Sequence, residues 1–297
     1  MSALSLRSRL GLRSIALFYL SALLIVPVGM IFYRTFEHGL SQPIDAVTSA
    51  DGLHAFWLTI VCVGIAVPLN TIFGVITALV LARQNFRGKA LLNAAIDIPF
   101  AISPVVIGLA LFLVYAPRNS WFGESLAENG IQIIFSLPGM ILATIFVSLP
   151  FVVREVMPVL QEIGTDQEEA AETLGATPWQ TFWRVTLPAI RWGVTYGVVL
   201  ATARALGEFG AVSVVAGNVS GSGGTQTLPL FVKDQFDNFS LAGAYAAALV
   251  LAIIAIAVLF SMSFLQKRSA RSVDADEEDH DLPGPGVFVP QPIQKEA

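Results

Sequence analysis

The sequence predicts an all-α, polytopic membrane protein with six transmembrane helices. Only 13% of its 297 residues are charged and 55% are hydrophobic, whereas soluble domains carry about 25% charged residues. The mean hydropathy is +0.69. Six apolar segments are each long enough to cross a hydrocarbon core of ~30 Å at a rise of ~1.5 Å per residue. They lie at about 14–33, 55–82, 91–115, 137–160, 190–216 and 241–265.

The first and fourth segments need separate justification. Arg7, Arg9 and Arg13 precede the first segment, as basic residues do in a secretory signal peptide. Its apolar run is longer than a signal core and no small-x-small cleavage site is evident, so we expect it to be retained as a span. The fourth segment is interrupted by Pro138 and Pro150, and we still expect it to cross the membrane.

The third segment carries polar residues and two prolines within IDIPFAISPVVIG (96–108). Pro99 and Pro104 each remove a backbone donor, so the helix is expected to kink or restart there. Asp97 lies about 10 Å into the span, and two interpretations remain open for it. It either caps a helix that begins near Pro99 or takes part in a translocation pathway. Ser103 is a candidate to offer its hydroxyl to an oxyanion at the break.

The fifth segment contains a charged pair, Arg204 and Glu208, four residues apart on one helix face. A charge near the middle of a membrane costs ~3 kcal/mol on an insertion scale, so these residues require an explanation. Either the pair attracts an anion or gates a pathway, or it is a neutralised pair that holds two helices together. Two rows of small residues predict close helix packing in the same segment. These rows are Gly193 and Gly197, and Ala203, Gly207 and Ala211.

The polar loop 161–189 between the fourth and fifth segments predicts two short helices bent at a glycine. Thr165 and Glu168 have the spacing of a capping box, and Gly175 can take the left-handed conformation that ends a helix. Thr177, followed by proline at the next position and Gln180 at the third, repeats the start signal. We expect the second helix to end before Pro188.

The same loop carries residues suited to contact with another protein. Ala170 and Ala171 are small enough to enter a groove closely. Trp179, Phe182 and Trp183 offer large aromatic area for burial. The alternative is an amphipathic hairpin that lies on the membrane surface.

The basic residues predict the orientation. Thirteen Lys and Arg residues fall on one side of the six segments, and only Arg34, Arg118 and Lys233 fall on the other. By the positive-inside rule, both termini and the loop 161–189 are expected in the cytoplasm.

Two parts make up the predicted domain organisation. Residues 1–268 form one membrane domain, and residues 269–297 form an acidic, proline-rich cytoplasmic tail that is expected to be disordered. Six spans are few to enclose a pathway, so a second membrane subunit, identical or paralogous, is expected beside it.

Several functions are excluded by what the sequence lacks. There is no Walker motif, so this chain alone is not expected to bind or hydrolyse ATP. No nucleophile, base and acid form a plausible catalytic set, and the chain is not predicted to be an enzyme. The three histidines and the single Cys62 are scattered, so neither a metal site nor a cofactor site is predicted in this chain. No basic patch suggests nucleic acid as a partner.

A spaced motif in the loop 161–189 carries a family resemblance. Residues 169–188 read EAAETLGATPWQTFWRVTLP, which fits E-A-A, three residues, Gly, nine residues, an aliphatic, any residue and Leu-Pro. The loop resembles the cytoplasmic coupling loop of membrane subunits of bacterial ABC importers. The motif positions filled in this chain are Glu169, Ala170, Ala171, Gly175, Val185 (where Ile is usual), Leu187 and Pro188.

Further phrases resemble the sulfate/thiosulfate permease branch of the molybdate-sulfate importer family. They are IDIPFAISPVVIGL (96–109), LPFVVREVMPVL (149–160), RVTLPAIRWG (184–193) and ARALGEFGAVSVVAG (203–217), and the resemblance extends over roughly residues 50–265. The phrase around Asp97 and the stretch FVVRE are more similar to the W-type sulfate subunit than to the T-type subunit or the molybdate permease.

The resemblance implies a type I importer fold, like that of molybdate and maltose permeases, in a bacterial inner membrane. The implied partners, besides membrane lipid, are a T-type sister permease, two ATP-binding subunits that hold ATP and Mg, and a periplasmic sulfate-binding protein. It also implies alternating access, with Glu169 and Gly175 important for coupling. Arg204, Glu208, Asp97 and Ser103 are the candidate translocation or gating residues.

Two further questions remain open from the sequence. A secondary transporter or channel that needs no ATPase would also account for charges within the membrane, but it would leave the coupling motif without a purpose. Sulfate, thiosulfate and molybdate are all tetrahedral dianions, and the residues of this chain do not choose among them.

Overall fold

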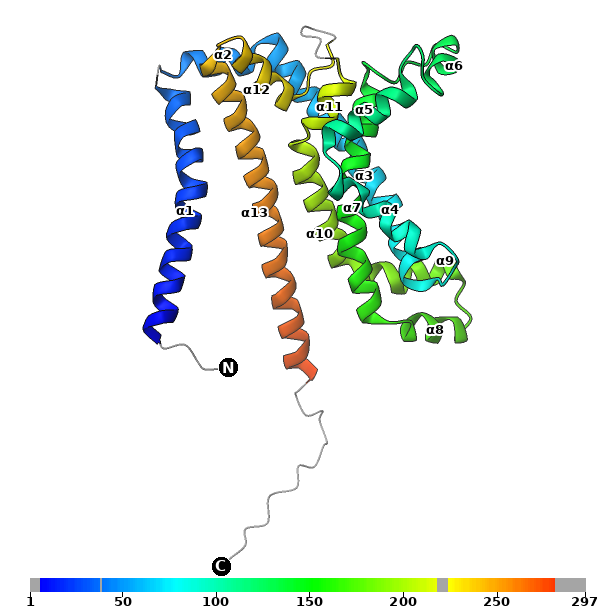
Figure 1. Cartoon of the computed structure of the whole chain (residues 1–297). Helices are drawn as coiled ribbons and strands as arrows, with labels where there is room; N and C mark the ends of the chain where they lie inside the picture. Colours follow the sequence, from blue (N-terminus) through cyan, green and yellow to red (C-terminus); the bar gives the residue numbers. More distant parts are fainter. Residues whose placement is uncertain (1–5, 38, 218–223, 281–297) are drawn as a thin grey trace, which may run out of the picture.

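The computed structural model describes residues 6–37, 39–217 and 224–280, and across these residues it is helical, with no strand. The long helices run side by side, and shorter ones gather at the two ends (Figure 1). In chain order the elements are α1 (Leu6–Phe36), α2 (Ser41–Thr48), α3 (Ala50–Arg83), α4 (Lys89–Ala101), α5 (Pro104–Tyr115), α6 (Gly123–Glu128), α7 (Leu137–Ile163), α8 (Asp166–Thr173), α9 (Pro178–Thr181), the π-helix η1 (Phe182–Thr186), α10 (Leu187–Leu206), α11 (Gly210–Val215), α12 (Leu228–Asp237) and α13 (Leu241–His280).

The predicted number of six apolar spans is not fully confirmed. Within the described residues, four helices are long and apolar enough to cross a membrane, and the pair α4–α5 makes a fifth if it is one span. The axes of α4 and α5 differ by 113°, so the third segment is sharply broken. The fifth segment is divided into α10 and α11 near Glu208, and α10 carries both Arg191 and Arg204.

Helix α7 is the centre of the packing. It contacts α3 and α10 most extensively, and it also contacts α4, α5 and α11. One buried cluster, which includes Met140 and Val212, joins α7 to α3, α5 and α11. A second cluster, which includes Val152 and Ile190, joins α7 to α3, α4 and α10. Between them, the buried Asn70 of α3 donates to the carbonyl of Ile145 (3.1 Å) and to the hydroxyl of Ser148 (2.8 Å).

Glycines allow α10 to approach α7 closely, as the first row of small residues predicts. A Cβ on Gly197 would lie 2.9 Å from the Cα of Val152. A Cβ on Gly193 would lie 3.0 Å from the carbonyl oxygen of Glu155. The second row behaves differently: Ala211 is fully buried, whereas Gly207 has space around it.

Two breaks in the helices lie side by side. Helix α5 restarts at Pro104, as the sequence predicts, while Pro99 lies inside the continuous helix α4. A Cβ on Gly210, the first residue of α11, would lie 2.8 Å from the Cβ of Pro104. The break between α4 and α5 therefore meets the break between α10 and α11.

The first residues of α1, the short helices α8 and α9, and the last residues of α13 lie at the same end of the molecule (Figure 1). Helices α2, α6 and α12 gather at the opposite end (Figure 1). Helix α13 runs on to His280, past the predicted start of the tail at residue 269, and residues 281–297 lie outside the described part. The disorder of the tail therefore stays a prediction.

Gly197→Val tests the packing of α10 on α7. We expect a loss of about 1–3 kcal/mol in stability, since the new side chain must displace Val152. The measurement is the apparent unfolding temperature of the detergent-solubilised protein. Gly64→Val is the matched control, because no atom lies within 4 Å of a Cβ at that position. Equal unfolding temperatures for the two variants would contradict the packing.

Candidate functional site

Residues 164–186, which hold α8, α9 and η1, form a projecting unit that we call the elbow. It leaves the bundle at Gly164, where φ is +72°, and it turns at Gly175, where φ is +87°. Helix α8 ends in a Schellman motif: the Gly175 amide donates to Glu172 O (2.9 Å) and the Ala176 amide donates to Ala171 O (3.0 Å). The prediction that Gly175 ends the first helix is confirmed.

The two predicted capping boxes have different outcomes. At the second helix the Gln180 amide donates to the Thr177 hydroxyl (3.4 Å), and the Thr177 amide donates to the Gln180 side chain (2.9 Å), so that box is confirmed. The box at Thr165 and Glu168 is wrong. The Thr165 hydroxyl donates instead to Glu169 Oε1 (2.7 Å), because Glu168 points to another partner.

The second helix of the elbow does not end before Pro188, which corrects the sequence prediction. The chain continues from α9 through η1 into α10, with Leu187 and Pro188 in the first turn of α10. Proline cannot donate to the i−4 carbonyl, and its ring clashes with that carbonyl in a regular α-helix. The wider π turn immediately before Pro188 lets the helix pass through the proline.

The elbow exposes large apolar side chains. Leu174 is 89% exposed, Trp179 is 70% exposed and Trp183 is 50% exposed. The rings of Trp179 and Trp183 meet edge to face, with centroids 5.5 Å apart. Among the predicted coupling positions, Glu169, Ala170, Gly175 and Pro188 are exposed, whereas Ala171 and Leu187 are partly buried. Such a surface suits burial against another protein.

An ion pair on the side of the elbow that faces the bundle holds the elbow to the bundle, and the sequence does not reveal this contact. Arg83 Nε donates to Glu168 Oε2 (2.9 Å) and its Nη2 donates to Oε1 (3.2 Å). Arg83 Nη1 also donates to the carbonyl of Leu160 (2.8 Å), and the Thr186 hydroxyl donates to Glu168 Oε1 (2.8 Å). Arg83 and Glu168 are 85 residues apart, so no local spacing signals the pair.

Two candidate translocation residues, Ser103 and Glu208, lie at the adjoining breaks, and Arg204 pairs with Glu208. Glu208 is buried, and its Oε1 accepts a hydrogen bond from the Ala211 amide (2.8 Å), which caps α11. Its Oε2 lies 2.7 Å from Arg204 Nη1, in an ion pair not aligned as a hydrogen bond. Ser103 is the exposed residue before α5, next to Pro104, and its hydroxyl makes no hydrogen bond to any described residue.

Asp97 is separate from these breaks. It lies inside α4, so the expectation that it caps a helix is wrong. Instead, its two carboxylate oxygens accept from Arg154 of α7, with Nε to Oδ1 at 2.9 Å and Nη2 to Oδ2 at 2.6 Å. The sequence gives both residues but not their contact, because they lie on different helices. The pair is partly exposed, at 27% for Arg154 and 46% for Asp97.

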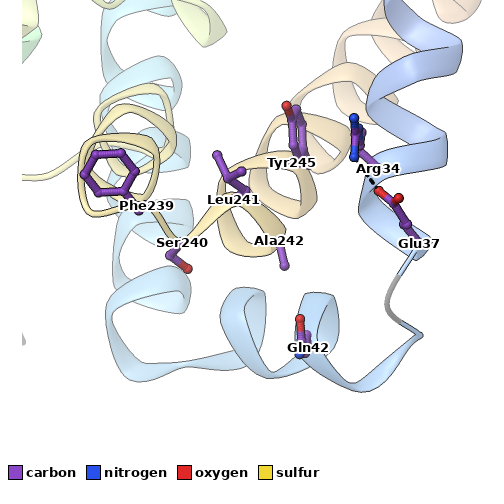
Figure 2. A pocket seen from close by; sticks show the side chains of 8 residues that line it. All are labelled: Arg34, Glu37, Gln42, Phe239, Ser240, Leu241, Ala242 and Tyr245. Atoms are coloured by element: carbon purple, nitrogen blue, oxygen red, sulfur yellow. Dashed lines mark hydrogen bonds and ion pairs between the residues drawn. The ribbon is translucent and has the colours of Figure 1, made fainter.

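A cavity of about 430 Å³ with a mixed polar and apolar lining lies at the end of the molecule opposite the elbow (Figures 1 and 2). Figure 2 shows Arg34 of α1 and Glu37, which follows α1, on one side of it and Tyr245 of α13 nearby. Arg34 Nη1 lies 2.8 Å from Glu37 Oε2, so the described lining offers no unpaired cation to an anion. In the described residues, no cluster of His, Cys, Asp or Glu is suited to a metal ion.

Comparison with known proteins places this geometry in a family. Residues 70–274 match the model of the family "binding-protein-dependent transport system inner membrane component". The chain is similar to the sulfate transport system permease protein CysW of Synechocystis sp., with 52% identity over 86% of this chain and 92% of that protein. It is also similar to the sulfate transport system permease protein CysT of Escherichia coli, with 36% identity over 87% of this chain and 92% of that protein.

A solved structure shares the fold. The crystal structure of a bacterial alginate ABC transporter, in complex with an alginate pentasaccharide-bound periplasmic protein, contains a chain that matches with a TM-score of 0.69. The match covers 88% of this chain and 95% of that chain, at 16% identity. The importer-permease fold that the sequence predicts is therefore confirmed, while the roles of the individual residues above stay predictions.

Proposed function

Because the chain belongs to the family of binding-protein-dependent transport system inner membrane components, we propose that it moves sulfate into the cell as one permease subunit of an ATP-driven importer. The exposed elbow is the observation that carries this proposal. A projection with Leu174 and Trp179 largely in solvent is costly unless a partner covers it. An ATP-binding subunit on the cytoplasmic face is the partner that would give the elbow a function.

The proposed orientation places the elbow in the cytoplasm of a bacterium, beneath its inner membrane. The excess of Lys and Arg on the elbow side supports this orientation. The start of α1 and the end of α13 lie at the same end as the elbow (Figure 1), so the orientation puts both termini in the cytoplasm as well.

The proposed assembly contains further chains. The relatives include both CysW and CysT permeases, which supports a pair of unlike permease subunits. The related alginate transporter was solved with a periplasmic protein, which supports delivery of the anion by a periplasmic binding protein. Two ATP-binding subunits, one beneath each permease, would bind ATP and Mg and hydrolyse the nucleotide.

Sulfate is the proposed cargo because the similar proteins are sulfate transport system permeases. Thiosulfate and molybdate are also tetrahedral dianions, and competition among labelled oxyanions for uptake distinguishes the three. A dianion that enters against ~100 mV, inside negative, faces about 4.6 kcal/mol. Import therefore needs an energy source, and ATP binding and hydrolysis would supply it through alternating access.

Glu169→Arg tests the docking of the elbow. Glu169 is exposed on α8, and reversing its charge alters the surface without disturbing a buried contact. We expect the variant to lose the ATP-binding subunit that co-purifies with the unmodified chain. Glu162→Arg is the control, since Glu162 is exposed at the end of α7, outside the elbow.

Sulfate uptake by proteoliposomes that contain only this chain is the measurement that can contradict the proposal. If the purified chain transports sulfate without any ATP-binding subunit, the chain is a secondary transporter or channel, and the proposal is wrong.

Arg204→Ala tests a role in the pathway. We expect sulfate uptake to fall while co-purification of the ATP-binding subunit is unchanged, because Arg204 lies far along α10 from the elbow. The single variant also leaves the buried Glu208 carboxylate unpaired, so the double variant Arg204→Ala/Glu208→Gln separates the two effects. Normal uptake in the double variant would assign the pair a purely structural role.

A further inference from the structure

Helix α8 is held to the bundle by few contacts. It buries none of its own described residues, and glycines with positive φ, Gly164 and Gly175, flank it on both sides. Its main packing neighbours are α9 and η1, which belong to the same elbow. Without a further tether, α8 could pivot about the two glycine positions while the bundle stayed still.

The ion pair between Arg83 and Glu168 supplies this tether. Charge-assisted, bidentate pairs of Arg and carboxylate combine strength with a fixed geometry. The two side chains are 18% and 20% exposed, so water screens them only partly. Asp166, Glu169 and Glu172, the other acids of α8, form no ion pair with any described residue, which makes Glu168 the one acid directed into the bundle.

Four elements meet at this pair. Arg83 is the last residue of α3, and its third contact, to the Leu160 carbonyl, joins α7. Glu168 belongs to α8, and it accepts from Thr186 at the end of η1, one residue before α10. A displacement of α8 therefore acts directly on the ends of α3, α7 and α10 that lie next to the elbow.

Helix α3 extends from this pair to the opposite end of the molecule. Its 34 residues span about 50 Å at a rise of ~1.5 Å per residue. Near its other end, the Thr59 hydroxyl accepts from the Leu228 amide (2.8 Å), and His54 Nε2 lies 2.9 Å from the Gly224 carbonyl oxygen. The helix thus connects the elbow with the segment that leads into α12.

We propose that Arg83 and Glu168 are positioning residues that transmit movement of the elbow to α3 and α7, so that ATP hydrolysis drives transport. The proposal rests on the proposed function, because it needs an ATP-binding subunit that moves the elbow. The pair lies behind α8, away from the exposed Leu174 and Trp179, so it acts after docking and not in docking itself.

Glu168→Gln is the direct test, in the complete complex with its ATP-binding subunits and a sulfate-binding protein in proteoliposomes. The substitution removes the charge and keeps an acceptor for Thr186. We expect the ATP-binding subunits to be retained and ATP hydrolysis to continue, while sulfate uptake per ATP hydrolysed falls roughly 5-fold or more. Glu172→Gln, on the same helix and exposed, is expected to keep the ratio of the unmodified complex.

A charge exchange protects the test against simple misfolding. Glu168→Arg alone places two cations together and is expected to lower the uptake per ATP further. Adding Arg83→Glu restores an ion pair and should recover at least part of the ratio, whereas no recovery would show that the two residues do not act as a pair.

Two results would overturn the proposal: an unchanged ratio of uptake to hydrolysis in Glu168→Gln, or loss of the ATP-binding subunits from that variant without recovery in the exchanged pair. Failure of the proposed function would differ from both, because the unmodified complex itself would then show no ATP-dependent uptake.

Discussion

The close approach of α10 to α7 determines where the elbow stands. The elbow begins where α7 ends and continues into α10, so its two ends are held only as firmly as these two helices are held together. Gly193 and Gly197 remove the side chains that would separate the helices, and α7 then fills the space with Val152 and its neighbours. A bulkier residue at either glycine would move one end of the elbow relative to the other.

Paired charges are the second constraint, because an isolated charge within a membrane is costly. Arg204 is matched by Glu208, and Arg154 by Asp97. The two arginines are similarly exposed, but Glu208 also caps α11 and is 2% exposed, whereas Asp97 on α4 is 46% exposed. A partly exposed pair does not suit contact with lipid, so we infer that this face of α4 and α7 borders protein or water in the assembly.

The features that the sequence predicts correctly are those with local signals. The left-handed Gly175, the capping box at Thr177 and Gln180, and the restart of the helix at Pro104 each depend on residues a few positions apart. The sequence also identifies the elbow as one unit, because the spacing of its motif lies within a single loop.

The errors have equally physical causes. Thr165 and Glu168 have the spacing of a cap, but a distant arginine forms a stronger, charged contact with Glu168. Pro188 reads as the end of a helix, yet a π turn accommodates it. Asp97 has the position of a helix cap before Pro99, but it pairs with Arg154, which lies 57 residues away and is therefore not found from local spacing. The predicted count of six spans is not fully confirmed, because apolar length alone does not show the break between α10 and α11.

Protection of a single thiol in the elbow tests the central claim most directly. In a Cys62→Ala background, which removes the only cysteine of the chain, Leu174→Cys places one thiol at the most exposed apolar position of the elbow. In inside-out membrane vesicles, we expect a membrane-impermeant maleimide to label this thiol readily when the ATP-binding subunits are absent and slowly when they are bound. Equal labelling in both states would show that the elbow stays in solvent, and would contradict the account.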